Sequence, residues 1–182
     1  AVRRCSYADV FIQHLQVDPH LIDLAELQSL AVAASSEAWA DETRANCLDL
    51  LFSVLIEPQL DDGLVLVYNY PACQAALAKC AEDSHGRQIS RRFEGFLNRV
   101  ELANGYCELT DAAEQAGRFA EDQRLRKLSG KTAVNADQRL LAAMESGLPE
   151  CAGVAMGVDR LLMQLQGADS IDQVMPFSWK RC

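Results

Sequence analysis

The sequence lacks long apolar runs, a signal-peptide pattern and an excess of basic residues, and each absence excludes a class of protein. No stretch approaches the roughly 18–20 uninterrupted apolar residues that a membrane helix needs, and the chain opens on no secretory pattern. The chain has 17 Lys and Arg against 26 Asp and Glu, a net charge of −9. This balance disfavours nucleic acid as the main partner, because nucleic-acid binders neutralise phosphates. The alternative is a local basic patch formed by Arg87, Arg91, Arg92 and Arg99.

The cysteines lack the spacing of a metal site or of a disulfide framework. There are seven, an odd number, and no C-x-x-C or His-rich spacing accompanies them. A zinc site and a secreted disulfide scaffold are therefore both disfavoured. We expect reduced thiols, several of them buried as small apolar groups, in a cytoplasmic protein that does not contact a membrane.

The sequence does contain enough apolar material for one folded domain. Its 182 residues are 49% hydrophobic and 24% charged, which predicts a buried core and argues against disorder. There is no internal repeat and no low-complexity segment. The chain begins at Ala1 without Met, and we expect it to be a piece of a longer protein.

Residues 1–62 have helical patterns, and strands and helices are mixed from residue 63 onward. Ser6, Asp23 and Asp41 each precede an apolar stripe and are predicted to begin helices. Strands followed by helices without strict alternation predict an α+β fold with an antiparallel sheet. The later elements are a strand at 64–68, a hairpin at 91–109 with a turn at Asn98-Arg99, a helix after Asp111, a helix at about 136–145, a strand at 151–156 and a helix at 158–166.

The hairpin concentrates acidic residues that could hold a cation. Counting from its turn pairs Phe96 with Glu101 and sets Glu94 opposite Ala103. Glu94 and Glu101 then lie diagonally on one face, about 7 Å apart by sheet geometry. Two carboxylates at that distance suit a hard divalent cation such as Mg²⁺, which takes oxygen ligands and bridges to phosphates.

A second part of the hairpin depends on a bulge. Glu108 is seven residues past Glu101, so a regular strand would point it to the opposite face. An extra residue in the segment 103–105, which contains Gly105, would change the parity and bring Asn104 and Glu108 onto the face of Glu101. That face could hold a metal at one end and an organic ammonium at the other. The alternative is a solvated acidic edge that discourages aggregation.

A glycine-rich strand followed by an arginine is the other candidate feature. Small residues at Gly153, Ala155 and Gly157 leave a flat floor on which a ligand can approach the backbone. Arg160 follows on the first turn of a helix, where its guanidinium can fork to phosphate or stack on a base. The alternative is close packing of strand on helix with an Arg–carboxylate surface pair.

Together these two features resemble class II aminoacyl-tRNA synthetases of the lysine type. Residues 101–111 look like the amino-acid- and metal-binding hairpin of that family, and residues 153–160 followed by 171–177 look like its motif 3. Residues 6–19, 70–78 and 149–153 are more similar to the elongation factor P–lysine ligase family. The resemblance implies a helical insert-like segment over 1–62. It also implies the C-terminal part of a class II catalytic domain over 63–182, an antiparallel sheet flanked by helices.

The resemblance also implies roles for single residues. Glu94 and Glu101 would hold Mg²⁺ against the phosphates of ATP. Glu101, Leu102, Gly157 and Arg160 would line the nucleotide site, and Glu101 and Arg160 would serve catalysis. The amino acid would bind at Gly153, Asn104, Glu108 and Ala155. In this set Glu108 would pair with an ammonium, and the methyl of Ala155 would favour a β-amino acid.

The implied reaction activates (R)-β-lysine or lysine as an acyl-adenylate and transfers it to a lysine of elongation factor P. The parent protein would be a homodimer that does not act on tRNA. Motifs 1 and 2 of class II enzymes are not visible, so we expect them upstream and expect the isolated chain to be inactive. Two alternatives remain: a lysyl-tRNA synthetase fragment, and a non-catalytic lysine-sensing relative.

Overall fold

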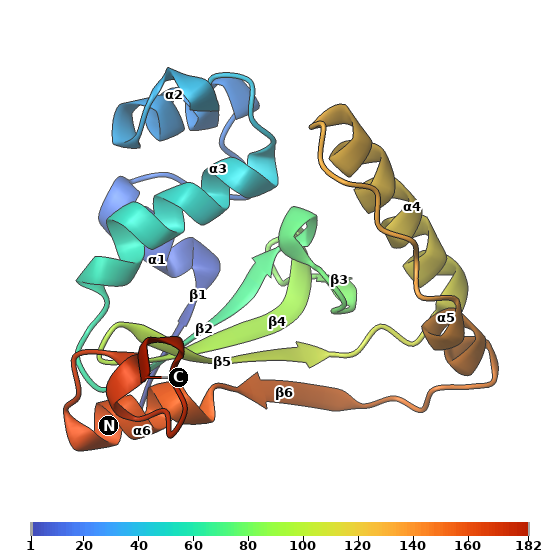
Figure 1. Ribbon diagram of the computed structural model, residues 1–182. Helices are drawn as coiled ribbons and strands as arrows, with labels where there is room; N and C mark the ends of the chain where they lie inside the picture. The colour runs from blue at the N-terminus through green and yellow to red at the C-terminus, as the bar shows by residue number, and fades with distance from the viewer. Residues whose placement is uncertain (1, 182) are drawn as a thin grey trace.

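The computed structural model describes residues 2–181 and shows a mixed α/β architecture with helices flanking one sheet (Figure 1). The described residues form a six-stranded sheet in the order β1-β2-β4-β5-β6, with β3 pairing to β4. This arrangement confirms the predicted α+β class. The strands are β1 Val2–Ser6, β2 Leu64–Pro71, β3 Cys80–Glu82, β4 Gln88–Leu97, β5 Val100–Cys107 and β6 Ala152–Met156.

Strand β1 was not predicted, because residues 1–62 carried only helical signals. It pairs in parallel with β2 along a register from Val2↔Leu64 to Ser6↔Tyr68. The other strand pairs are antiparallel, as expected. A five-residue strand with mixed polarity has no clear period of its own, so only its pairing with β2 makes it a strand.

The helices begin at side chains that satisfy free backbone N–H groups. Ser6 and Asp9 form a capping box, and Asp23 accepts from the N–H of Leu24, so both predicted starts are confirmed. The predicted start at Asp41 was wrong, because Thr43 accepts from the N–H of Asn46 and caps the third helix. The helices are α1 Tyr7–Leu15, α2 Leu24–Ala34, α3 Arg44–Leu51, α4 Ala112–Leu128, α5 Gln138–Glu145 and α6 Val158–Gln166.

Short helical turns join several of these elements. A π-helical turn continues α3, and 3-10 turns lie between helices or after strands. These turns are η1 Glu37–Trp39, η2 Phe52–Ile56, η3 Glu57–Gln59, η4 Ala72–Gln74, η5 Ile171–Gln173 and η6 Trp179–Arg181. The turn η3 brings Glu57 close to the sheet, which matters for the site described below.

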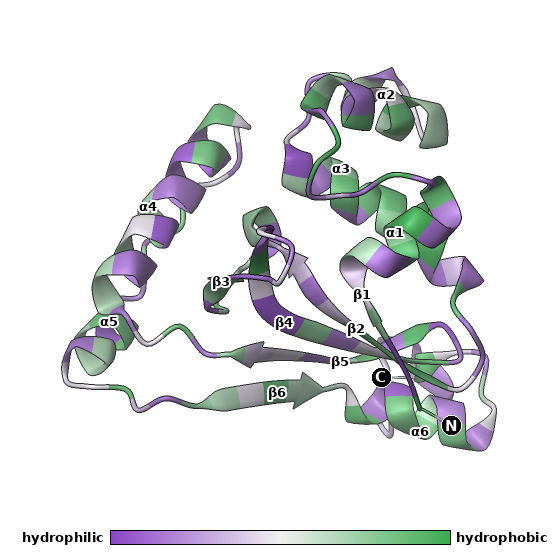
Figure 2. Ribbon diagram, turned by 180° about the vertical axis from the view of Figure 1, so that it is seen from behind, coloured by the Kyte–Doolittle hydropathy of each residue, from purple (hydrophilic) through white to green (hydrophobic). Residues whose placement is uncertain are grey.

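One aromatic cluster joins the N-terminal helices to the sheet. Tyr7 of α1 stacks on Phe52 with ring centroids 5.4 Å apart and meets Tyr70 of β2 at 4.5 Å. Phe52 also meets Phe96 of β4 at 5.7 Å, and all four rings are buried. The predicted boundary at 62/63 therefore separates two sequence regions that share one core, and the assignment of residues 1–62 to an insert stays a prediction. Figure 2 shows apolar residues on α1 and α3, the helices that lie over the sheet.

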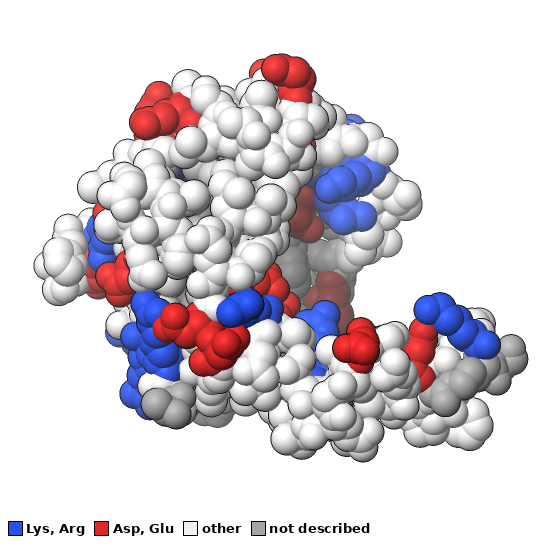
Figure 3. Space-filling view, turned by 90° about the vertical axis from the view of Figure 1, so that its left-hand side faces the viewer, with Lys and Arg blue, Asp and Glu red and all other residues white. Residues whose placement is uncertain are grey.

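The basic residues that the sequence left as a possible local patch are mostly paired with acidic residues. Arg87 contacts Asp18 and Asp83, and Arg92 contacts Glu94. Arg99 lies 3.0 Å from Asp62. Acidic and basic side chains are interspersed on the face drawn in Figure 3. No helix of the described residues is long and apolar enough to cross a membrane.

Candidate active site

Most of the predicted site residues lie on three neighbouring strands, β4, β5 and β6. Glu108 follows the end of β5, and Gly157 and Arg160 lie at the start of α6. In the observed register Glu94 pairs with Asn104, and Asn104 pairs with Ala155. Directly paired residues of antiparallel strands point to the same face of a sheet. The side chains of Glu94, Asn104 and Ala155 therefore share one face. Tyr106 and Gly153 form the next pair on that face.

A bulge puts these residues on one face, but its position differs from the prediction. The register of β4 with β5 shifts between Gly95 and Phe96, which leaves Leu102 as the extra residue. Glu94 consequently opposes Asn104, and the predicted pairing of Glu94 with Ala103 was wrong. The carbonyl of Leu102 accepts the N–H of Gly157 at 2.8 Å, so the bulge also holds the start of α6.

Gly105 has a packing role that the prediction did not assign. A Cβ at this position would lie 2.3 Å from the ring of Phe93. This distance is too short for any side-chain carbon, so β5 requires a glycine where Phe93 crosses it. The expected bulge at 103–105 was based on a glycine that the structure uses for close packing instead.

Glu101 and Arg160 are in contact at one end of this face. Arg160 Nη1 donates to the carbonyl oxygen of Glu101 at 2.9 Å and lies 3.5 Å from its Oε2. Their side chains are 38% and 49% exposed, respectively, so a charged ligand can still reach both. The structure thus brings these two predicted site residues together. Gly157 is the N-cap of α6, and a Cβ there would meet Arg160 only at ordinary contact distance, 3.6 Å.

Glu94 lies deeper, in a network of hydrogen bonds. Tyr70 Oη donates to its Oε2 at 2.7 Å, Arg92 forms an ion pair with it, and Asn104 Nδ2 lies 3.5 Å from its Oε1. Burial raises the pKa of Glu94, and the nearby Glu101 raises it further, while Arg92 and Tyr70 oppose the rise. The repulsion from Glu101 is what a cation between the two carboxylates would relieve.

Glu57 is a third carboxylate near this end, and the sequence reasoning missed it. Burial raises its pKa, followed by the charges of Glu101 and Glu94, while Arg160 lowers it. Glu57 and Glu94 also line a cavity of about 410 Å³ against the helical segment. No sequence motif marks Glu57, since it is brought to the site by the turn η3 and not by the pattern of the hairpin.

The donor set suits a magnesium ion only in part. The described residues contain no group of three or more His, Cys, Asp or Glu that could hold a metal. Mg²⁺ usually takes one or two carboxylates and completes its shell with waters and substrate phosphates. Glu94 and Glu101 fit that pattern, because the charge of Glu101 helps to raise the pKa of Glu94 and both side chains face the same side of the sheet.

Replacing Glu57 by Gln tests the electrostatics of this cluster. The pKa of Glu57 is raised, so its ionised form destabilises the fold above its ordinary pKa of 4.5. The variant should therefore melt at a higher temperature than the wild type near pH 7. The gain in melting temperature should disappear below about pH 4, where the wild-type carboxyl is protonated in the folded and in the unfolded state. Melting curves from pH 3 to 8 check this, with the exposed Glu145→Gln as control. An equal gain at every pH would contradict it.

Glu108 lies at the other end of the same face. Its backbone N–H donates to the carbonyl of Cys151 at 3.0 Å, and its backbone bridges to Ala78. A Cβ on Gly153 would lie 2.5 Å from Glu108 Oε1, so this glycine leaves room for the carboxylate above β6. Among the described residues no hydrogen bond or ion pair joins Glu108 to Glu101 or Arg160. The face therefore carries two separate polar ends, with Asn104 and Ala155 between them.

The chain matches the family model of class II tRNA synthetases (D, K and N) over residues 12–181. A match of this extent shows membership, and the chain belongs to that family. The observed sheet and the position of Glu101 beside Arg160 agree with the hairpin and motif 3 through which the resemblance was seen.

Curated relatives show which members of this family the chain is similar to. Elongation factor P–(R)-β-lysine ligases are 42% identical in Sodalis glossinidius and in Klebsiella pneumoniae subsp. pneumoniae, each over 179 residues. The ligase of Edwardsiella ictaluri is 43% identical over 179 residues. In each case the match covers 97% of this chain and 54% of the relative. The chain thus spans about half the length of the curated relatives it matches.

Proposed function

We propose that this chain is part of an enzyme that activates (R)-β-lysine or lysine with ATP and transfers it to a lysine of elongation factor P. The proposal rests on the observation that one face of the sheet carries a polar cluster at each of its two ends. Glu101 and Arg160 form the first end, and Glu108 above Gly153 forms the second. The similarity to elongation factor P–(R)-β-lysine ligases supports the same reading.

The first end suits a nucleotide. Arg160 presents a half-exposed guanidinium that can fork to phosphate oxygens. Leu102 and Gly157 form the backbone beside it, joined by a 2.8 Å hydrogen bond. Glu94 and Glu101 would hold Mg²⁺, which neutralises phosphate charge as the acyl-adenylate forms. Arg160 would stabilise the same charge and orient the α-phosphate towards the carboxylate that attacks it.

The second end suits the amino acid. Glu108 would accept the ammonium of the substrate, and Asn104 and Gly153 would contact its other polar groups. A buried ammonium–carboxylate pair rejects substrates without the amine, because the carboxylate would be left unpaired. The methyl of Ala155 projects from β6 on the same face, between the two ends, and would narrow the space near the substrate backbone.

The wider role follows from the same proposal. Elongation factor P would be the acceptor and tRNA would not, and the protein would be a homodimer that works in the cytoplasm, where translation factors act. The 182-residue chain alone should give no adenylation. A lysyl-tRNA synthetase fragment and a lysine-sensing relative are the competing functions.

The test uses the full-length protein with ATP, Mg²⁺ and either (R)-β-lysine or L-lysine. We expect ATP–pyrophosphate exchange and a mass increase of one aminoacyl group on elongation factor P. Charging of lysine tRNA without modification of elongation factor P would instead identify a lysyl-tRNA synthetase. Lysine binding by calorimetry without turnover of ATP would identify a sensor.

A further inference from the structure

The backbone of Glu108 is held between two segments of the chain. On one side its N–H donates to Cys151. On the other side Ala78 bridges to Glu108, the N–H of Lys79 donates to Cys107 at 2.8 Å, and the N–H of Leu109 donates to Leu77 at 2.9 Å. The position of Glu108 therefore depends on residues 76–79, which we call the 76–79 segment.

The 76–79 segment is not a regular strand and begins in an unfavourable conformation. It connects the turn η4 to β3, and Ala76 has a φ of 48°. A left-handed backbone is unfavourable at a non-glycine residue, because its Cβ crowds the carbonyl oxygen. Such a conformation persists only where neighbouring contacts hold it.

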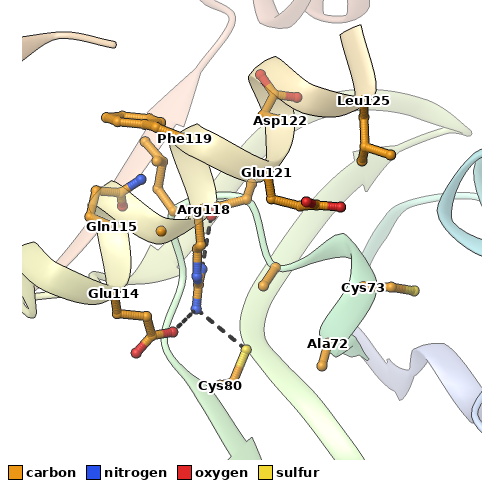
Figure 4. A pocket seen from close by; sticks show the side chains of 14 residues that line it. Ala72, Cys73, Cys80, Glu114, Gln115, Arg118, Phe119, Glu121, Asp122 and Leu125 are labelled. Atoms are coloured by element: carbon orange, nitrogen blue, oxygen red, sulfur yellow. Dashed lines mark hydrogen bonds and ion pairs between the residues drawn. The ribbon is translucent and has the colours of Figure 1, made fainter. Parts of the chain in front are cut away.

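Arg118 of α4 supplies those contacts. Its Nη1 donates to the carbonyl of Ala76 at 2.9 Å and to that of Ala78 at 2.8 Å. Its Nη2 lies 3.5 Å from the sulfur of Cys80 and bonds to Glu114 at 2.5 Å (Figure 4). The planar fork of a guanidinium can hold two carbonyls and a carboxylate at once, which a lysine ammonium cannot do with the same geometry.

A cavity of about 810 Å³ lies between α4 and residues 72–80, lined mainly by small and apolar side chains (Figure 4). Arg118 reaches from α4 to the backbone at this cavity, with its side chain only 21% exposed. The helix itself is fixed at its start by Asp111, which accepts the N–H of Glu114.

We propose that Arg118 is a positioning residue for Glu108. Within the described part of the chain no hydrogen bond or ion pair joins it to Glu108 or to the residues of the nucleotide end, and it acts through the 76–79 segment. This inference rests on the proposed function, in which Glu108 binds the ammonium of the amino acid. Loss of the fork should let the segment and Glu108 shift, which weakens binding of the amine and spares ATP.

The experiment compares Arg118→Met, which keeps the apolar stem, with Arg118→Lys and with Arg124→Met. Arg124 lies on the same helix, is exposed and pairs only with Glu121 among the described residues. The first readout is amide hydrogen exchange in the 182-residue chain. Arg118→Met should speed exchange of the Lys79 and Leu109 N–H groups about tenfold or more, since local opening loses at least one charged hydrogen bond. Arg118→Lys should do so less, and Arg124→Met should have no effect.

The second readout is the KM for the amino acid and for ATP in the full-length protein. Arg118→Met should raise the KM for the lysine-type substrate about five- to twentyfold and leave the KM for ATP within about twofold. Unchanged exchange at Lys79 and Leu109, or exchange accelerated equally throughout the sheet, would overturn the proposal. An unchanged KM for a lysine-type substrate that the wild type uses would also overturn it. If the exchange responds and the wild type uses no lysine, the positioning stands and the proposed function fails.

Discussion

Glu108→Gln in the full-length protein is expected to lower kcat/KM for the lysine-type substrate by roughly 10²–10³-fold, about 3–4 kcal/mol. Gln has the same shape but no charge, so the substrate ammonium would lose its ion pair in a site built for it. The KM for ATP should stay within about twofold, because Glu108 lies just past the end of β5, seven residues from Glu101 in sequence, and forms no hydrogen bond or ion pair with Arg160 in the described residues.

ATP–pyrophosphate exchange at varied amino acid concentrations measures this effect. Gly153→Ala is a companion variant, because its Cβ would lie 2.5 Å from Glu108 Oε1 and must displace the carboxylate. It should raise the KM for the amino acid in the same direction. Glu145→Gln, on the exposed side of α5, is the control. A loss of less than about threefold for Glu108→Gln would remove this residue from the binding site.

Phe52→Ala should destabilise the fold by about 3–5 kcal/mol, since it removes a buried ring and leaves a cavity. Phe52 is 6% exposed and its ring meets Tyr7, Tyr70 and Phe96 at 5.4, 6.3 and 5.7 Å. A loss of this size is a large part of the roughly 5–15 kcal/mol that stabilises a typical domain.

Urea unfolding of the 182-residue chain measures this loss. Because the ring joins the N-terminal helices to β2 and β4, circular dichroism and tryptophan fluorescence should report one transition that shifts as a whole. Phe177→Ala, at a side chain that is 83% exposed, should change stability by less than about 0.5 kcal/mol. Two separate transitions, with only one affected by Phe52→Ala, would show that residues 1–62 and 63–182 fold independently.

The candidate site was predictable wherever its residues lie close in sequence. The turn at Asn98-Arg99 was expected from its neighbours, and both residues have the positive φ values, 49° and 69°, of a two-residue hairpin turn. A turn of known length sets the pairing of the residues beside it, so Phe96 does oppose Glu101. Prediction failed at the next residue of β5, Leu102, because the position of a bulge depends on how side chains pack across the sheet. Phe93 occupies the space beside Gly105, and the extra residue is Leu102.

Of the residues that surround Glu94, only Arg92 could have been predicted from the sequence. Tyr70 and Arg92 surround Glu94, and Glu57 approaches it from a turn after α3. Arg92 is two residues before Glu94, a spacing that puts both side chains on one face of a strand, and this signal could have found it. Tyr70 and Glu57 lie on other elements and carry no motif, so only their packing against the sheet brings them to the site.

Local interactions between neighbouring residues account for the helix starts at Ser6, Asp23 and Asp111 and for the hairpin turn. They also account for the succession of strand β6 and helix α6, which carries Arg160 on its first turn. These features involve residues a few positions apart, where backbone sterics and capping hydrogen bonds act without help from the rest of the fold. The strand β1, the bulge at Leu102 and the hold of Arg118 on the 76–79 segment arise only when distant segments meet. Their energies come from pairing and packing across the sheet, and those contacts do not exist until the chain has folded.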